Sequence, residues 1–288
     1  MTWLLGLLLA LLDPALFGPG APGGRGVVIP LAPPSDDELG PLPPVTAARG
    51  DNPPLVVIDA GHGGRDPGAR SEYASVPEKD ITLALAIEIR DALAATGRVR
   101  VALTRSDDTY LVLQDRYEIA RRLGAELFVS VHADIAPSND QARGATIYTL
   151  SEVASDREAA ALAHGQNEAD NLSGARFSPD PNVNLVLIDL AQRESMDASA
   201  EFARLLHREA APIFPFRPAW HRFAAFIVLK APDLPSILFE AGYLSNPTDA
   251  AYLQSPQGRA QIADGMRRAI EAHFAGRFRQ LGQVRPPS

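Results

Sequence analysis

Residues 55–64 have the sequence LVVIDAGHGG, in which a short apolar run leads into an acid, a histidine and three glycines. Residues 55–58 are apolar throughout and mostly β-branched, as expected for a strand buried on both faces of a parallel sheet. The glycines predict a tight turn at the end of this strand. His62 therefore lies directly beyond a buried strand end, where open parallel sheets bind their ligands.

The rest of the chain continues this pattern, with apolar runs typical of strands alternating with segments of helical periodicity. Further strands are predicted at residues 99–103, 127–131, 145–150, 225–229 and 236–239. Helices are predicted between Pro77 and Gly97, over residues 113–123, from Asn246 and over residues 257–274. Strands separated by helices predict an α/β fold, with a twisted, mostly parallel sheet flanked by helices.

The composition of the 288 residues limits the kind of protein this can be. Hydrophobic residues make up 46% and charged residues 22%, as in ordinary globular proteins, so a wholly disordered chain is excluded. The absence of cysteine excludes disulfides, thiolate metal ligands and a cysteine nucleophile. A net charge of −8 without a basic cluster argues against a nucleic-acid partner. Any metal in this protein is therefore held by His, Asp and Glu.

The two ends of the chain differ in composition from its middle. Residues 1–17 contain an apolar run, 3–12, that is too short to span a bilayer and has the length of a secretory signal core. We expect export to the periplasm, with no transmembrane segment in the mature protein; the alternative is a short hydrophobic helix that packs on the domain. Residues 18–54 are rich in Pro and Gly and predict a disordered arm, ahead of a folded domain at 55–276 and a flexible tail at 277–288.

One segment, residues 151–224, interrupts the alternation because it carries helix signals and no convincing pair of strands. Ser155 and Glu158 have the spacing of a helix capping box ahead of an alanine-rich stretch. Insertions into enzyme sheets often cover active sites. We therefore predict a helical insertion near the active site.

Four side chains that can bind a metal converge on one region of the predicted fold. His62, His132 and Glu240 each follow a predicted strand, and the carboxyl ends of parallel strands meet at one sheet edge. Glu78 begins the helix that leads back to this edge. Two imidazoles, two carboxylates and no thiol suit catalytic zinc, which takes three protein ligands and water. Either histidine alone could instead be structural, and the glycines could form only a tight turn; the patterns of a phosphate-binding loop are absent.

Five segments of the chain, in this order, resemble the zinc-dependent N-acetylmuramoyl-L-alanine amidases, type 3. They are DAGHGGRDPGA (59–69), PEKDITLALA (77–86), VALTRSDDTYLVLQDRYEIA (101–120), LFVSVHAD (127–134) and ILFEAGYLSNPTD (237–249). The resemblance covers about residues 55–275 and implies that the folded domain at 55–276 is an amidase catalytic domain.

This resemblance assigns a role to each of the four converging residues. It implies that His62, Glu78 and His132 bind Zn²⁺ and that Glu240 is the catalytic carboxylate. A carboxylate within hydrogen-bond reach can take a proton from water and return it to the leaving amine. The implied substrate is the amide between N-acetylmuramic acid and L-alanine in peptidoglycan, cut during cell-wall remodelling and daughter-cell separation. We expect a monomer.

The predicted insertion is also similar to a known segment. Residues 154–174 resemble a part of the periplasmic cell-separation amidases in which a helix blocks the zinc site until an activator displaces it. The hypothesis is that residues 151–195 form such an autoinhibitory lid, released by an activator of the LytM type. Glu158, Glu168 or Asp170 could then supply a carboxylate to the metal in the closed state. The alternative is a rigid wall around the substrate groove.

Two other functions fit the same residues: a zinc peptidase that acts on small peptides, and a catalytically inactive cell-wall-binding module. The presence of all four site residues disfavours the inactive module. Asp59 and Asp134 either orient the histidines or form turns, and Asn246 is expected to cap a helix. The remaining histidines are expected on the surface or in packing roles: His164, His207, His221 and His273.

Overall fold

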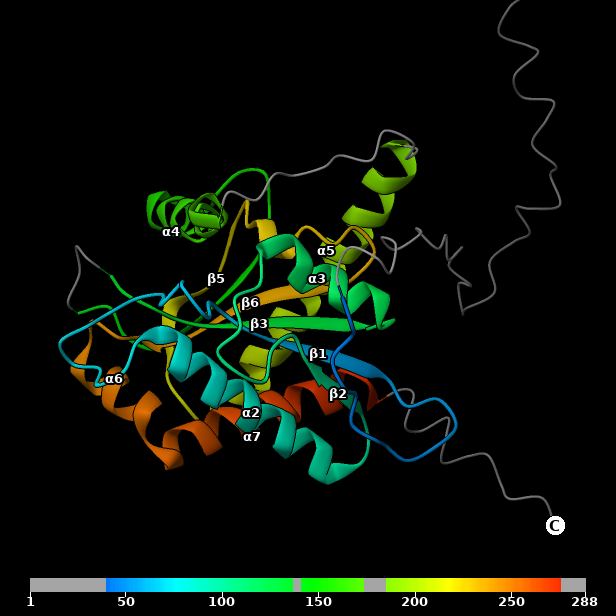
Figure 1. Ribbon diagram of the computed structural model, residues 1–288, viewed down its shortest axis with the longest axis horizontal. Helices are drawn as coiled ribbons and strands as arrows, with labels where there is room; N and C mark the ends of the chain where they lie inside the picture. Colours follow the sequence, from blue (N-terminus) through cyan, green and yellow to red (C-terminus); the bar gives the residue numbers. More distant parts are fainter. Residues whose placement is uncertain (1–39, 137–140, 174–184, 276–288) are drawn as a thin grey trace, which may run out of the picture. The chain divides into compact units, whose positions relative to one another are not determined.

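The computed structural model describes residues 40–136, 141–173 and 185–275. They form one six-stranded sheet with helices on both faces (Figure 1). The strands are β1 Leu55–Ala60, β2 Arg100–Leu103, β3 Leu127–Asp134, β4 Ala145–Leu150, β5 Phe216–Ala224 and β6 Ser236–Tyr243. The helices are α2 Glu78–Thr96, α3 Leu113–Arg122, α4 Arg157–Asn167, α5 Leu185–Ala210, α6 Pro247–Gln254 and α7 Pro256–His273, with 3₁₀ turns η2 Glu168–Ser173 and η3 Ile227–Leu229.

The sheet has the strand order β2-β1-β3-β6-β4-β5. The four strands β2, β1, β3 and β6 run parallel to one another, so their carboxyl ends share one edge. β4 runs antiparallel to β6, and β5 runs parallel to β4. The prediction of an α/β fold with a mostly parallel sheet is confirmed.

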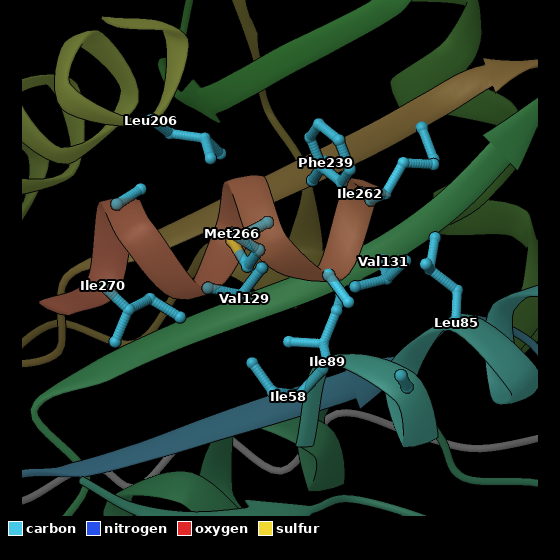
Figure 2. Packing of buried hydrophobic residues seen from close by; sticks show 14 of the residues in the cluster. Ile58, Leu85, Ile89, Val129, Val131, Leu206, Phe239, Ile262, Met266 and Ile270 are labelled. Atoms are coloured by element: carbon cyan, nitrogen blue, oxygen red, sulfur yellow. The ribbon is translucent and has the colours of Figure 1, made fainter. Parts of the chain in front are cut away.

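The pleat of the strands divides the core into two halves. On one face, α2, α5 and α7 cover side chains such as Ile58 and Val129, and Figure 2 shows Met266 packed among them. On the other face, α3, α4 and η3 cover Val57 and Phe128. Burial of apolar surface on both faces stabilises the central strands, at about 25 cal/mol per Å².

Local sequence signals explain where the helices begin and end. The i, i+4 apolar residues of α2 are buried, and the helix ends at Gly97, whose φ of 63° is the left-handed conformation that suits glycine. The side chain of Asn246 accepts hydrogen bonds from the Thr248 and Asp249 amides and so caps α6, as expected. Ser255 caps α7 in the same way.

The predicted insertion at 151–224 is wrong in part. Its last residues form β5, an edge strand. The sequence gives no clear strand pattern there, because the pairing of β5 with β4 shifts register between Ala145 and Ile147 and because Pro218 interrupts the strand. The carboxyl-terminal half of α5 belongs to the core, where Phe202 and Leu206 are completely buried. The remaining described elements of this segment are α4, whose Ala159 and Ala163 are buried in the second half of the core, and η2.

Two further expectations are corrected. Residues 225–229 form no strand and include η3, because a short apolar run buried under the sheet has the same composition as a strand. The cap of α4 is Asp156, whose side chain accepts from the Ala159 amide, and not Ser155. The Glu158 side chain forms an ion pair with Arg217, so the capping box does not form.

Part of the predicted disordered arm, residues 45–54, is ordered along β2. Val45 forms a β-bridge with Ala102, and the Thr46 amide donates to the Val101 carbonyl at 2.9 Å. Residues 1–17 and the tail at 277–288 lie outside the described residues. Within the part of the chain that is described, no helix has the length and apolarity needed to cross a membrane.

Candidate metal centre

His62 stands on a sharply turned loop at the carboxyl end of β1. Three successive residues have positive φ: His62 at 61°, Gly63 at 128° and Gly64 at 57°. A glycine is needed at position 61 for a different reason, since a Cβ there would lie 2.3 Å from Cε1 of the His132 ring. The glycines predicted to form a turn therefore let two histidines of neighbouring strands approach each other closely.

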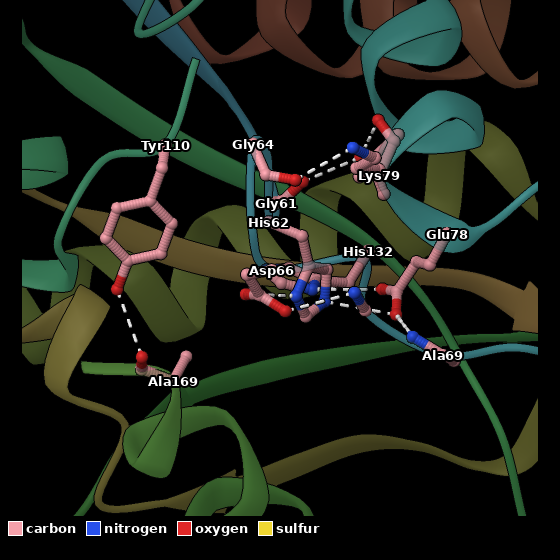
Figure 3. Close-up of polar contacts among 12 residues, drawn as sticks. Gly61, His62, Gly64, Asp66, Ala69, Glu78, Lys79, Tyr110, His132 and Ala169 are labelled. Carbon is pink, nitrogen blue, oxygen red and sulfur yellow. Dashed lines mark hydrogen bonds and ion pairs between the residues drawn. The ribbon is translucent and has the colours of Figure 1, made fainter. Parts of the chain in front are cut away.

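His62, Glu78 and His132 come together as predicted (Figure 3). Nε2 of His62 lies 3.0 Å from Oε2 of Glu78, and Nδ1 of His132 lies 3.2 Å from Oε1 of the same carboxylate. The two imidazole rings meet edge to face, with centroids 4.8 Å apart. One ligand atom from each residue lies within 4.8 Å of the other two, and all three side chains are buried.

Glu78 is fixed by its place as the first residue of α2. Its Oε2 accepts from the Ala69 amide at 2.8 Å, and its Oε1 accepts from the Ala133 amide at 2.9 Å. A negative charge at a helix N-terminus is also favoured by the helix dipole. The carboxylate is thus held between the two imidazoles by backbone on both sides.

The charges of this group are strongly coupled. Burial opposes ionisation of Glu78, but the positive charge of His62 and a hydrogen bond with His132 outweigh it and hold the pKa of the carboxyl well below its usual range. Burial lowers the pKa of His62, but Glu78 and Asp66 raise it to about 9. Burial and the charge of His62 lower the pKa of His132. The Glu78 carboxylate therefore favours a positive charge beside it, whether carried by a proton on His62 or by a bound cation.

Asp66 is a member of the site that sequence reasoning missed. Its Oδ2 lies 2.7 Å from Nδ1 of His62, and its Oδ1 accepts from the Gly68 amide at 3.0 Å. A carboxylate on the second ring nitrogen fixes the orientation and tautomer of a ligand histidine. The only signal in the sequence is an acid four residues after a histidine in a glycine-rich turn.

Glu240 lies beside His132 because β3 and β6 pair these two residues in register. Both side chains leave the sheet on the face that α3 and α4 cover. Glu240 is completely buried, and its two carboxylate oxygens have no hydrogen-bond partner among the described residues. Burial, together with the charges of Asp134 and Glu78, raises the pKa of Glu240 well above its usual range.

These atoms fit a bound metal ion. Both carboxylate oxygens of Glu240 are buried and have no hydrogen-bond partner among the described residues, and Nε2 of His62 faces the Glu78 carboxylate at 3.0 Å. Such groups cost free energy unless a ligand or ion satisfies them. Two imidazoles and one carboxylate, with further acid alongside, are a donor set that catalytic zinc uses.

A cavity of about 940 Å³ opens above the metal centre. His62 and Glu78 lie at its base, α4 forms one wall with Glu158 and Leu162, and Glu168 of η2 also lines it. His62, Glu78 and the inner residues of α4 therefore line the same cavity.

The three acids considered for a closed lid occupy different places. Glu158 pairs with Arg217 at 2.5 Å and with Arg222 at 3.1 Å, both on β5. Glu168, the first residue of η2, lines the cavity and lies 3.4 Å from His164. Asp170 accepts from the Leu113 amide at 3.0 Å and so caps α3. None of them joins the group of described residues able to hold a metal.

The neighbouring acids have distinct roles. Asp59 is completely buried and bonds to Arg116, Thr104 and Ser130, so it supports the β1 strand end and touches neither histidine through a hydrogen bond. Asp134 lines the cavity. The remaining histidines lie away from the metal centre: His164 is exposed, His207 stacks on Trp220, His221 contacts Thr149, and His273 packs on Phe202.

The sequence matches the family model of N-acetylmuramoyl-L-alanine amidases over residues 56–272. The chain is 34% identical over 226 residues to the N-acetylmuramoyl-L-alanine amidase AmiC of Escherichia coli O6:H1, covering 78% of this chain and 54% of AmiC. It is 36% identical over 222 residues to AmiA of Escherichia coli K12, covering 76% of each chain. The chain thus spans about half the length of this AmiC, 54%, and more of AmiA, 76%.

Solved structures of the same kind share the fold. The catalytic domain of CwlV, an N-acetylmuramoyl-L-alanine amidase from Bacillus (Paenibacillus) polymyxa var. colistinus, gives a TM-score of 0.58 at 28% identity, covering 77% of this chain and 98% of that one. AmiC2 of Nostoc punctiforme gives 0.56 at 26% identity, covering 78% and 99%. Both similarities extend over nearly the whole of the described domain.

Proposed function

The chain belongs to the type 3 family of N-acetylmuramoyl-L-alanine amidases, and we propose on that premise that it hydrolyses the amide between N-acetylmuramic acid and L-alanine in peptidoglycan. One observation carries the proposal: two imidazoles and a carboxylate converge at the base of a cavity, beside a buried carboxyl that lacks a hydrogen-bond partner among the described residues. A binding module that performs no chemistry has no need to bury such a carboxyl.

We assign His62, Glu78 and His132 as the ligands of a zinc ion. Zinc held there supplies a Lewis acid that polarises the scissile carbonyl and makes water more acidic. Asp66 orients the His62 ring through its 2.7 Å hydrogen bond, which leaves Nε2 directed toward the shared site. Backbone amides on both oxygens keep Glu78 from rotating away from the two imidazoles.

We assign Glu240 as the group that moves protons. In hydrolysis, the carboxylate takes a proton from the attacking water and gives it to the nitrogen of L-alanine as the carbon–nitrogen bond breaks. Proton transfer is most efficient when the pKa of the group lies near the working pH. Burial and the neighbouring acids move the pKa of Glu240 upward in that direction.

The metal assignment can be tested on purified protein. We expect about one zinc ion per chain by mass spectrometry, loss of activity on sacculi after chelation, and recovery when zinc is added back. The His62→Ala variant should contain little zinc, whereas His207→Ala, on a histidine stacked on Trp220, should contain as much as the wild type. Equal zinc in all three proteins, or none in the wild type, would overturn the assignment.

We further propose that α4 and η2 limit access to the metal centre and that an activator protein of the LytM type moves them. The support is their position, because α4 lines the cavity and is tied to β5 through Asp156, Glu158 and the arginines of that strand. Replacing residues 157–184 with a Gly/Ser linker should raise basal activity on sacculi. A fall in activity would instead identify α4 as a wall that binds substrate.

Export to the periplasm and a role in cell separation remain part of this proposal. They are supported by the apolar run at residues 3–12 and by the substrate, which lies outside the cytoplasm. Fractionation of cells that express the full chain, with sequencing of the mature N-terminus, tests export. A protein that keeps residues 1–17 and stays in the cytoplasm would contradict it.

A further inference from the structure

We propose that Arg105 and Arg116 are positioning residues of the metal centre, which hold the backbone of residues 60–62 in the one conformation that directs His62 at Glu78. Their roles are not evident in the sequence. The proposal rests on the proposed function, because it concerns how the chain shapes its metal site. Both side chains are almost completely buried, with 3% and 2% exposure.

Arg116 reaches the His62 loop from α3. Its Nη2 donates to the His62 carbonyl at 2.9 Å, and its Nη1 donates to the Ala60 carbonyl at 2.8 Å. The same Nη1 lies 3.0 Å from Oδ1 of Asp59, so a completely buried carboxylate balances its charge. Nη2 and Nε also donate to the Leu111 carbonyl, at 3.0 and 3.1 Å.

Arg105, which follows β2 in the sequence, donates hydrogen bonds to the same loop. Its Nε donates to the Ala60 carbonyl at 2.9 Å, and its Nη2 donates to the Gly61 carbonyl at 2.7 Å. Nη2 also donates to the Lys79 carbonyl at 2.9 Å, which lies directly after Glu78 in α2. One guanidinium therefore links the backbone next to two of the three proposed ligands.

The conformation that these arginines hold is an unfavourable one. His62 has a φ of 61°, and it is the one residue other than glycine in the described part of the chain with positive φ. Side chains with a Cβ rarely adopt this region unless their surroundings fix it. The carbonyls of residues 60, 61 and 62 all accept hydrogen bonds from the two guanidinium groups, so the strained turn is fixed at each peptide.

The loop packs so closely on Arg105 that position 63 has no room for a side chain. A Cβ at position 63 would lie 3.0 Å from Nε of Arg105 and 2.2 Å from the Thr109 carbonyl oxygen. The absence of a side chain there lets the guanidinium run alongside the turn. Lysine cannot replace this arrangement, because one ammonium has no planar fork to span carbonyls in different directions.

The test compares zinc affinity in Arg116→Lys, Arg105→Lys and a matched control, Arg121→Lys. Arg121 is an equally suitable arginine on α3, since it is 9% exposed and pairs with Glu118 and Asp233, away from the His62 loop. Lysine keeps the positive charge at each position, and in Arg116→Lys that charge stays beside Asp59, so the variants are expected to fold. Chelator competition measures the zinc Kd, and the visible spectrum of the Co²⁺-loaded proteins reports ligand geometry independently of activity.

We expect Arg116→Lys and Arg105→Lys to bind zinc about tenfold or more weakly, with an altered Co²⁺ spectrum. Arg121→Lys should lower the melting temperature and leave the Kd and the spectrum as in the wild type. Zinc affinity within twofold of the wild type in both test variants would overturn the proposal and leave the proposed function standing. A wild-type protein that binds no zinc would overturn both, and should one test variant fail to fold, the other decides.

Discussion

Nδ1 of His62 lies 2.7 Å from Oδ2 of Asp66, and both residues are 8% exposed. This hydrogen bond fixes the ring nitrogen that faces away from Glu78 and keeps the other nitrogen available as a ligand. A carboxylate in this position also makes the imidazole a stronger donor to a metal.

Asp66→Asn should therefore weaken zinc binding by roughly 10- to 100-fold. Asp108→Asn is the matched control, because Asp108 accepts from the Gly64 amide in the same loop and does not contact His62. Chelator competition at fixed pH gives both dissociation constants. Equal loss of affinity in the two variants would assign the effect to the loop as a whole.

The Glu240→Gln variant distinguishes a role in proton transfer from a role in zinc binding. Glutamine keeps the size of the side chain but cannot exchange protons, so hydrolysis of sacculi should fall by about 10² to 10⁴. Zinc content should stay at the wild-type level, because the proposed ligands are other residues. If the variant hydrolyses sacculi within twofold of the wild type, Glu240 is not the proton carrier.

Gly68→Ala tests how closely the loop approaches the ligands. A Cβ at this position would lie 2.6 Å from Oε2 of Glu78 and 2.6 Å from Cδ2 of His62, so both side chains must move. We expect zinc affinity to fall by about tenfold or more, as for other losses of ligand support.

Gly124→Ala is the control for backbone strain alone. Its φ of 69° matches the 65° of Gly68, but a Cβ at position 124 would have no neighbour within 4 Å. This variant should lose about 1 kcal/mol of unfolding free energy and keep its zinc affinity. Loss of zinc binding in the control would contradict the steric explanation.

The pH dependence of stability can test whether Asp170, in η2, lies beside Asp115 of α3. Burial and the negative charge of Asp170 raise the pKa of Asp115 from 3.8 to about 6. A raised pKa means that ionisation disfavours the folded state, so this residue lowers stability as pH rises from about 4 through about 6.

Asp115→Asn should therefore stabilise the protein at pH 7.5 by about 1 kcal/mol, after allowance for partial exposure to solvent, and by about half as much at pH 5. Urea unfolding at the two pH values measures the difference. A gain of the same size at both values would show that Asp170 does not sit beside Asp115 in solution.

The central strands and two of the ligands follow from the sequence for one physical reason. The strands β1, β3 and β6 each contain a buried apolar run, so they are evident in the sequence, and the polar residues that follow these runs stand out. His62, His132 and Glu240 are such residues. The structure extends β3 and β6 beyond the predicted ends, so that His132 and Glu240 lie within them. Glu78 is less evident, because a helix that begins with an acid is common, and the resemblance to a family was needed to assign it.

Other parts of the structure leave no local signal. β5 is an edge strand with a broken register, so its residues need not alternate. Asp66 acts through a hydrogen bond to a ring nitrogen. Arg105 and Arg116 act through hydrogen bonds to the carbonyls of residues 60–62, which are more than 40 residues away in sequence. Neither the periodicity nor the composition of a sequence predicts hydrogen bonds between residues so far apart.

The bond that the protein cleaves is the most direct test of the account. Purified sacculi are incubated with the zinc-loaded protein, and the soluble products are identified by mass spectrometry, with Glu240→Gln as the control. Hydrolysis of the proposed bond yields intact stem peptides that begin with a free L-alanine amine, together with glycan strands that carry the free lactyl carboxylate. Peptides cut within the stem, or products that do not depend on Glu240, would contradict it.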